Sequence, residues 1–335
     1  MGKRGQGLVT ATVFLVCVVA SACAPNQATS DPAASGGLTI AVFTKNQTNP
    51  YFQSVRLGAE SAARQAHVAV VHYVPTKPDS IPEQMSQIED AITRRPSGVV
   101  FIPVDSKAMV PGVQRLNAAR IPVVNIVDRS AGGEFVSFMA CDEYGVALGT
   151  ARYLLAKMNG RGSLVIIEGV GGSANNTERL RGFRAALADA PGVKVLASQP
   201  GNFQRLQALQ VMENLLQSFP DVDAVLAAND AMALGAIEAL ESAGRHALVA
   251  GVNGTKEAVD AIKAGRLVAS GQCDAYLQGC LGTMAAVRNA RKQAVPREYA
   301  FPITILDRTN YTGADLPDGE RSCPAWDALV KDIRE

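Results

Sequence analysis

The chain has 335 residues, 47% hydrophobic and 19% charged, so its length fits two domains of roughly 150 residues and its composition excludes a disordered or fibrous protein. Its 32 basic and 31 acidic residues leave a net charge of +1, which excludes a general binder of nucleic acid or of anionic membranes, because such binders need a concentrated positive field. Three histidines without metal-ligand spacing and six cysteines without a CxxC motif predict no metal site and exclude a zinc ribbon.

The first 22 residues have the pattern of an export signal. Two basic residues precede an uncharged apolar run over 8–20, which is too short to span a hydrocarbon core of ~30 Å as a straight helix. The small residues at 20–22 resemble the end of a lipoprotein signal, which implies cleavage before Cys23 and lipidation of its thiol. Ordinary export with cleavage after an A-x-A-like site is the alternative. We favour the lipoprotein, because a lone thiol at the cleavage point otherwise has no purpose.

Residues 23–37 are then a lipidated cysteine followed by a flexible tether, since 24–37 contain no large apolar side chain. We expect the mature protein to be exported, periplasmic or extracytoplasmic, and anchored to a membrane through the lipid on Cys23.

From residue 38 onward, short β-branched strands alternate with amphipathic helices. The first half has predicted strands at 38–43, 68–73, 99–104 and 121–127, a helix over 80–94, and a helix that Asn49-Pro50 opens with an N-cap residue and a first-turn proline. The strands are continuous apolar runs, which are typical of parallel strands buried on both faces.

The same rhythm repeats in the second half. Strands are predicted near 163–167, 193–197, 223–227, 247–251, 267–272 and 301–306, with helices near 143–157, 175–189, 203–218, 230–243 and 274–292. In the helix over 203–218, Leu206 and Met212 belong to the predicted buried stripe. The alternation predicts an α/β protein with parallel sheets covered by helices on both faces. Ligands bind at the carboxyl ends of the strands in such sheets, so functional side chains are expected just after strands.

Tyr51 and Phe52 stand out in the loop after the first strand, together with Lys45 and Asn49. Aromatic faces suit the C–H faces of a sugar ring, and amides or charges beside them satisfy its hydroxyls. The alternative is that both aromatic residues are core residues of a first helical turn.

Three further strand ends carry polar residues. At Asp128 and Arg129, a carboxylate that accepts hydrogen bonds stands beside a guanidinium with five N–H donors, and such a pair could bind ligand hydroxyls. The alternative is an ordinary solvated ion pair at a strand end. Asn229 precedes a helix and Asn253 precedes Gly254, so an N-cap and a turn residue are their alternatives.

No enzyme signature or cofactor site is predicted. The glycine-rich turn at 169–174 matches a dinucleotide-binding turn only loosely, since no acidic residue ends the following strand, and we interpret it as a cleft loop leading to Arg179. GxSxG, HExxH and GxxxxGK[ST] motifs do not occur.

A series of spaced motifs over about residues 38–307 resembles the periplasmic sugar-binding proteins of ABC importers, the branch typified by ribose-binding protein. The motifs are TNPYF, IPVVNIVDR, ERLRGF, VLASQPGNF, FPDVDAVLAANDAMALGA and VNGTKEAV. The resemblance implies the type I periplasmic binding protein fold, with two doubly wound parallel-sheet lobes joined by a three-segment hinge. It places the N-terminal lobe at 38–141 plus 274–303, and the C-terminal lobe with the tail at 142–273 plus 304–335.

By the same resemblance, the chain crosses between the lobes near 303–305 and at four named hinge residues, which are Cys141, Asp142, Gln272 and Cys273. Matching positions also imply a set of ligand contacts, which are Asn49, Tyr51, Phe52, Asp128, Arg129, Arg179, Phe203 and Asn229.

This sequence departs from the ribose-binding pattern at several positions. Lys45 replaces a small hydroxyl residue, which looks similar to members that bind deoxysugars or furanosyl autoinducers. Asn253 replaces an expected Asp, and Cys273 an expected Gln, with Asp274 beside it as a substitute acceptor. The added positive charge suits a sugar acid or a differently hydroxylated polyol, unless Asp128 or Asp274 neutralises Lys45.

The resemblance therefore predicts a monomeric capture protein of an ABC importer. It would close two lobes on one small polyhydroxylated ligand and present it to a membrane permease. A sensor that docks on a chemoreceptor or histidine kinase is the alternative. A transcription repressor with the same core is excluded by the export signal at the N-terminus. We expect Arg179→Ala to weaken ligand binding and to leave thermal stability nearly unchanged.

The cysteines allow two pairings in an oxidising compartment. Cys141 and Cys273 would be neighbours if both lie at lobe crossings, although two buried free thiols are the interpretation we favour. A disulfide between Cys280 and Cys323 would link the tail to the helix predicted over 274–292.

Overall fold

The computed structural model describes residues 1–2, 37–219 and 221–330. The apolar run of the export signal, Cys23 and residues 24–36 lie outside the described residues. Within the described ranges, none of the helices combines the length and the apolarity needed to cross a membrane.

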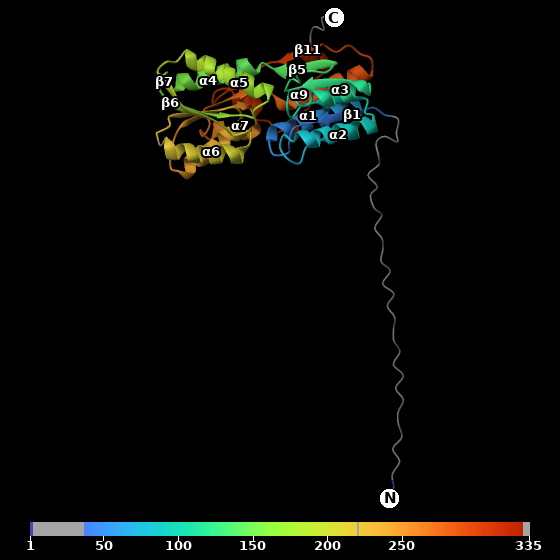
Figure 1. Cartoon of the computed structure of the whole chain (residues 1–335), viewed down its shortest axis with the longest axis horizontal. Coiled ribbons are helices and arrows are strands. Elements are labelled where there is room, and N and C mark those ends of the chain that lie inside the picture. The colour runs from blue at the N-terminus through green and yellow to red at the C-terminus, as the bar shows by residue number, and fades with distance from the viewer. Residues whose placement is uncertain (3–36, 220, 331–335) are drawn as a thin grey trace.

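Two six-stranded sheets with helices on their faces form two lobes that lie side by side (Figure 1). The N-terminal sheet has the order β11-β5-β4-β3-β1-β2 and is parallel at every pairing. Its register places Ile40 beside Val70 in one neighbouring strand and beside Gly98 in the other. Its strands are β1 (Thr39–Phe43), β2 (Ala69–Tyr73), β3 (Gly98–Phe101), β4 (Val123–Ile126), β5 (Ser137–Cys141) and β11 (Glu298–Phe301).

The C-terminal sheet has the order β12-β10-β9-β8-β6-β7, in which β12 runs antiparallel to β10 and the other neighbours are parallel. Its strands are β6 (Gly162–Glu168), β7 (Val193–Pro200), β8 (Ala224–Ala227), β9 (Leu248–Asn253), β10 (Ala269–Gln272) and β12 (Thr304–Leu306). The central strands are buried on both faces, as their continuous apolar sequences predict.

Most of the helices begin at a residue whose side chain accepts a hydrogen bond from the first turn, which satisfies an otherwise unpaired backbone N–H group. Asn49, Ser173 and Asn229 are such N-caps. The helices of the N-terminal lobe are α1 (Pro50–Ala66), α2 (Ile81–Arg94), α3 (Val110–Ala118) and α9 (Ala275–Ala290). Those of the C-terminal lobe are α4 (Glu143–Lys157), α5 (Ala174–Ala188), α6 (Arg205–Ser218), α7 (Asp230–Ser242) and α8 (Lys256–Lys263).

The predicted fold class is confirmed, with three local corrections. Strand β5 was not predicted. The single strand predicted at 301–306 is two strands, because the chain leaves one sheet after Phe301 and joins the other at Thr304. The predicted stripe on α6 is partly wrong, because Ala208, Met212 and Leu215 face the core while Leu206 is 66% exposed.

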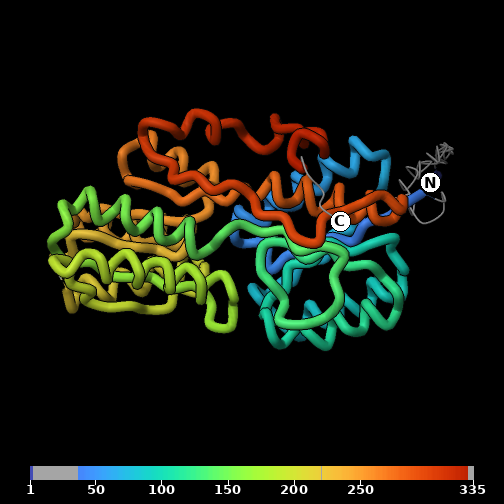
Figure 2. Tube along the Cα trace, turned by 90° about the horizontal axis from the view of Figure 1, so that it is seen from above, coloured from blue at the N-terminus to red at the C-terminus, as the bar shows by residue number. Residues whose placement is uncertain are grey.

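Three segments cross between the lobes, and Figure 2 shows them as adjacent tubes. They lie between β5 and α4, between β10 and α9, and between β11 and β12. The first crossing follows Cys141, the last residue of β5, and contains Asp142, while the second follows Gln272, the last residue of β10, and contains Cys273.

Cys141 and Cys273 form a disulfide with Cα atoms 6.0 Å apart, which joins two of the crossings. Cys280 and Cys323 form a second disulfide. The favoured interpretation of two free thiols at Cys141 and Cys273 is therefore wrong, because the crossing segments run close together.

The tail does not stay with the C-terminal lobe to which 304–335 were assigned. Its first part, η2 (Tyr311–Ala314), packs on α8 of that lobe. Its later parts, η3 (Asp318–Glu320) and α10 (Trp326–Leu329), lie on the N-terminal lobe, where Trp326 and Val330 enter the core. Burial of these two apolar side chains explains why the tail returns to the first lobe.

Candidate ligand-binding cleft

A cavity lies between the lobes at the carboxyl ends of the strands. Its volume is about 30 Å³, which leaves room for roughly one water molecule, so the side chains of the two lobes meet across it. A ligand as large as a sugar can be admitted only if the lobes part. The lining residues are Lys45, Asn46, Asn49, Tyr51, Phe52, Asp79, Val127 and Asp128 from the N-terminal lobe, and Ser173, Asn175, Arg179, Phe203, Asn229 and Asn253 from the C-terminal lobe.

The two aromatic residues after β1 lie in the first turn of α1, as the core interpretation predicts, and they also line the cavity. The rings of Tyr51 and Phe52 pack edge to face with centroids 5.5 Å apart. The Tyr51 hydroxyl accepts a hydrogen bond of 2.6 Å from Nε2 of Gln278. Burial, reinforced by the charge of Glu143, raises the pKa of Tyr51. The phenol therefore stays protonated and can donate a hydrogen bond to a ligand oxygen.

Lys45 and Asp128 form a buried ion pair, with Nζ 2.9 Å from Oδ2 and side-chain exposures of 4% and 1%. Burial alone would lower the pKa of Lys45, but the negative charge of Asp128, assisted by Asp79, outweighs it and raises the pKa. The lysine is therefore charged, and its charge is neutralised inside the protein. This is the neutralisation by Asp128 that the sequence left as an alternative.

The carboxylate of Asp128 also reaches the other lobe. Its Oδ2 accepts a hydrogen bond of 2.8 Å from the Ser173 hydroxyl, and its Oδ1 accepts one of 3.4 Å from the backbone N–H of Asn175. Ser173 is the N-cap of α5, so the carboxylate lies at the positive end of that helix. Asp128 thus connects the two lobes across the cleft.

Arg179 is buried on α5 and held from two sides. Its Nε lies 2.6 Å from Glu143 Oε2, and its Nη1 donates to the carbonyl of Ala228 at 2.7 Å. Burial disfavours the charge of Arg179, but the carboxylate of Glu143 outweighs burial and raises the pKa. The guanidinium lies 5.9 Å from the centroid of the Phe203 ring, within the range of a cation–π contact.

The ring of Phe203 reaches the cavity because Gly169 leaves space for it. A Cβ atom at Gly169 would lie 2.1 Å from the ring, which is impossible without displacing it. Asn229 caps α7 by accepting from Met232 N, and its amide nitrogen donates to the Phe203 carbonyl. Asn229 is therefore both an N-cap and a cleft residue.

Asn253 ends β9 with a positive φ of 139° beside Gly254, as a turn residue. Its Oδ1 is buried without a hydrogen-bond partner among the described residues. An unsatisfied buried acceptor is costly, and a ligand hydroxyl could supply the missing donor.

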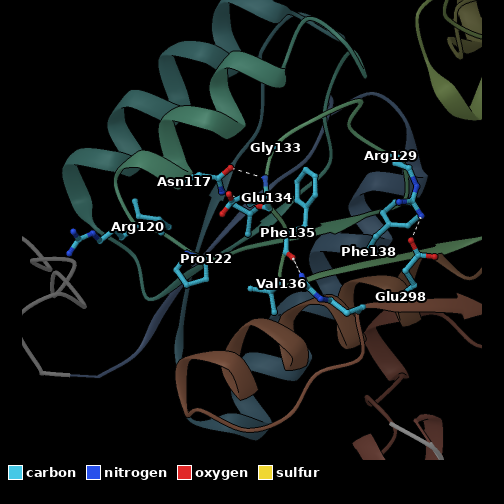
Figure 3. A pocket seen from close by; sticks show the side chains of 13 residues that line it. Asn117, Arg120, Pro122, Arg129, Gly133, Glu134, Phe135, Val136, Phe138 and Glu298 are labelled. Carbon is cyan, nitrogen blue, oxygen red and sulfur yellow. Dashed lines mark hydrogen bonds and ion pairs between the residues drawn. The ribbon is translucent and has the colours of Figure 1, made fainter. Parts of the chain in front are cut away.

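Arg129 lies outside the cleft, which corrects its expected position. Val127 has a positive φ of 65°, and this turn after β4 directs Asp128 into the cleft and Arg129 away from it. Figure 3 shows Arg129 in a separate hollow of about 730 Å³ on the N-terminal lobe. There its guanidinium stacks 3.7 Å from the centroid of the Phe138 ring and forms an exposed ion pair of 2.9 Å with Glu298.

Asp274 also lies elsewhere. It caps α9 and pairs with Arg321 of the tail, because that arginine is brought to it when the tail returns to the N-terminal lobe. It borders a small second cavity that shares Tyr51 and Asn253 with the ligand cleft.

Five residues that line the cleft were not named as ligand contacts from the sequence, although Ser173 lies in the predicted cleft loop; they are Asn46, Asp79, Val127, Ser173 and Asn175. Ser173 offered a usable signal, because a helix N-cap that follows a strand end lies at the ligand-binding edge. Asp79 offered none, since it sits in an irregular connection with a left-handed φ of 55°. The described residues contain no group of His, Cys, Asp or Glu side chains that could hold a metal ion.

Comparison with known proteins gives one consistent result. The sequence profile of the family described as "Periplasmic binding protein domain" matches residues 40–294. The ribose import binding protein of Bacillus subtilis (strain 168) is 34% identical over 309 residues, which cover 91% of this chain and 99% of that protein.

Solved structures agree. The crystal structure of an ABC transporter periplasmic solute binding protein from Actinobacillus succinogenes 130z with bound D-allose has a TM-score of 0.78 at 29% identity, covering 82% of this chain and 99% of that one. An ABC transporter solute binding protein from Bacillus halodurans C-125 with bound myo-inositol has a TM-score of 0.77 at 26% identity, covering 84% of this chain and 98% of that one.

Proposed function

We propose, from the premise that this chain belongs to the periplasmic binding protein family, that it is the substrate-binding protein of an ABC importer. It captures one small sugar or polyol between two closing lobes and delivers it to a membrane permease. Its role is transport, and it is not an enzyme. Relatives named for ribose import and structural neighbours with bound D-allose and myo-inositol support this assignment.

The observation that carries the proposal is the convergence of side chains from both lobes on one cavity between them. Closing the lobes stabilises the bound state only if both lobes contact the ligand. We propose that the ligand contacts are Lys45, Asn49, Tyr51, Phe52, Asp128, Arg179, Phe203, Asn229 and Asn253, all of which line the cavity. The aromatic rings would pack on the C–H faces of the ring, and the polar groups would bind its hydroxyls.

Charge pairing favours a neutral ligand over the sugar acid that the sequence left open. Each cation of the cleft already has a carboxylate partner, since Lys45 pairs with Asp128 and Arg179 with Glu143. An anionic ligand would compete with these partners, and Asp79 adds a further carboxyl group to the lining. A neutral ligand can accept and donate hydrogen bonds without breaking either pair.

A thermal-shift screen tests the function. D-Ribose, D-allose, xylitol and myo-inositol would be compared with D-gluconate and D-galacturonate. A ligand at 100 times its dissociation constant adds about 2.7 kcal/mol to the free energy of unfolding, so one of the neutral compounds should raise the melting temperature. A rise with the acids and none with the neutral compounds would contradict the charge argument, and recovery of a chemically altered sugar would contradict a transport role.

We further propose that residues 1–22 direct export to the periplasm or another extracytoplasmic compartment, that Cys23 carries a lipid anchor, and that the mature protein is a monomer. The support is the basic and apolar pattern of the first 20 residues and the small residues before Cys23. Cys23→Ala should move the protein from the membrane fraction to the soluble fraction. A variant that stays in the membrane fraction would show that the anchor lies elsewhere.

A further inference from the structure

The tail makes a fourth connection between the lobes. Residues 307–330, here called the strap, leave β12 in the C-terminal lobe and end in the core of the N-terminal lobe. In Figure 2 the strap is the red tube that passes along the upper side of both lobes. The family match ends at residue 294, so the strap lies outside it.

On the C-terminal lobe the strap is held by packing of Tyr311 and Ala314 against the core, by a hydrogen bond of 3.3 Å from Arg308 to the Lys263 carbonyl, and at its far end by Asp315. Its carboxylate lies 2.8 Å from Lys263 Nζ and 3.3 Å from Lys256 Nζ, both on α8. The three side chains are 30–41% exposed. Exposed ion pairs of this kind are weak, and salt screens them.

On the N-terminal lobe the strap is held much more firmly. The Arg321 carbonyl accepts a hydrogen bond of 2.7 Å from the Tyr276 hydroxyl, and its guanidinium pairs with Asp274. Two residues later Cys323 is bonded to Cys280 of α9, and Trp326 is buried beyond it. The weaker end of the strap is therefore the one on the C-terminal lobe, where partly buried side chains and the ion pairs of Asp315 replace a disulfide and a buried tryptophan.

The free length between the two ends is short. Asp315 and Asp318, where η3 begins, are three Cα steps apart, and a fully extended chain covers at most roughly 10 Å in three steps. The lobes therefore cannot separate Asp315 and Asp318 by more than this length unless the strap detaches from one lobe. The strap also walls the small cavity behind Tyr51 and Asn253 through Leu316 and Arg321.

We propose that the strap is a releasable brace on cleft opening. While Asp315 holds Lys256 and Lys263, the strap restricts the lobes to a narrow opening, and full opening requires the release of Asp315 from α8. This role goes beyond capture of a ligand, and it applies to the ligand-free protein whatever the ligand is.

Small-angle X-ray scattering of the ligand-free protein tests the brace. At low ionic strength, Asp315→Asn should increase the radius of gyration by on the order of 1 Å from roughly 20 Å for a compact chain of this size. Wild type should approach the value of the variant at ~1 M NaCl, where screening acts within about 3 Å, and the variant itself should respond little to salt.

The matched control is Asp189→Asn, which removes an exposed pair with Arg152 away from the strap and should behave as wild type. Cys280→Ser with Cys323→Ser removes only one of the contacts at the other end of the strap, where Tyr276, Asp274 and the burial of Trp326 remain, and should enlarge the protein less than Asp315→Asn does. Because Asp315→Asn changes only a partly exposed side chain on the surface, it decides the question even if the cysteine variant fails to fold.

An Asp315→Asn protein with the wild-type radius at low salt would overturn the proposal. An enlarged control variant would overturn it as well. No sugar is used, so a failure of the brace is distinguishable from a failure of the proposed transport function.

Discussion

Asp128 and Arg129 are adjacent in the chain but face different parts of the molecule. Both were predicted to bind the ligand, since both follow a strand that ends at the cleft. The left-handed turn at Val127 places the aspartate in the cleft and the arginine on Phe138. The positive φ of Val127 could not be predicted from the residue types of this segment. A sequence can therefore predict the position of a binding loop without predicting which of its side chains enters the site.

Arg179→Ala should destabilise the protein, contrary to the expectation from the sequence. The substitution leaves Glu143 buried without its cation, and removal of one partner of a buried ion pair costs about 3–5 kcal/mol. Urea unfolding measures the loss. Glu143→Gln in the same background should recover part of it, and Arg152→Ala, which breaks an exposed pair, should cost less than about 1 kcal/mol. If Arg179→Ala unfolds at the same midpoint urea concentration as wild type, the Arg179–Glu143 pair does not contribute to the free energy of unfolding.

Asp79 gives a pH-dependent prediction. Burial, assisted by the charge of Asp128, raises the pKa of Asp79, although Lys45 acts in the opposite direction. A carboxyl group with a raised folded-state pKa contributes stability below its ordinary pKa of 3.8 and loses that contribution as pH rises through the raised value.

Asp79→Asn should therefore raise the free energy of unfolding at pH 7 and change it little at pH 3.5. Urea titrations at the two pH values measure both quantities. A variant that is less stable than wild type at pH 7 would mean that attraction to Lys45 outweighs the cost of burial.

At the scale of elements, periodicity predicted most strands and helices because each buries an apolar run or stripe. Periodicity missed β5 and predicted β11 and β12 as one strand. These strands are short, and their limits depend on which sheet each one pairs with. The helix ends that shape the site were predictable where a capping residue follows a strand, as at Asn49 and Asn229. Long-range packing decides the rest, including which face of α6 is buried.

The disulfide between Cys141 and Cys273 connects the hinge to the cleft. Gln278 links the disulfide to the cleft, because its amide nitrogen is 3.1 Å from Cys273 Sγ and 2.6 Å from the Tyr51 hydroxyl. The disulfide closes a chain separation of 132 residues, against 43 for Cys280–Cys323. The loop-entropy relation then gives roughly 5 kcal/mol for the first and roughly 4 kcal/mol for the second.

Cys141→Ser with Cys273→Ser should therefore lower the free energy of unfolding by up to about 5 kcal/mol and also weaken sugar binding, because Tyr51 loses part of its support. Urea unfolding and calorimetric titration with the sugar selected by the thermal-shift screen measure the two effects. Gln278→Leu, which keeps the disulfide, should weaken binding in the same way. Sugar binding as tight as wild type in both variants would show that the hinge disulfide and Gln278 do not support the binding site.

At the scale of the whole molecule, the resemblance in sequence predicted the two lobes and the three crossings, because its motifs cover both halves of the chain. The later part of the tail, from η3 onward, was assigned to the wrong lobe, since no motif extends past about residue 307. Its destination depends on Trp326, Val330 and the disulfide at Cys323, whose partners lie far away in the sequence. The lipid anchor on Cys23 stays a prediction.

The central claim is that both lobes hold one ligand in the cavity between them. Hydrogen–deuterium exchange with and without the neutral sugar that raises the melting temperature most tests it directly. We predict simultaneous protection of backbone amides in two sets of segments, around Asn49 and Asp128 in one lobe and around Ser173 and Asn229 in the other. Protection confined to one lobe, or to the hollow around Arg129 and Phe138, would contradict the account.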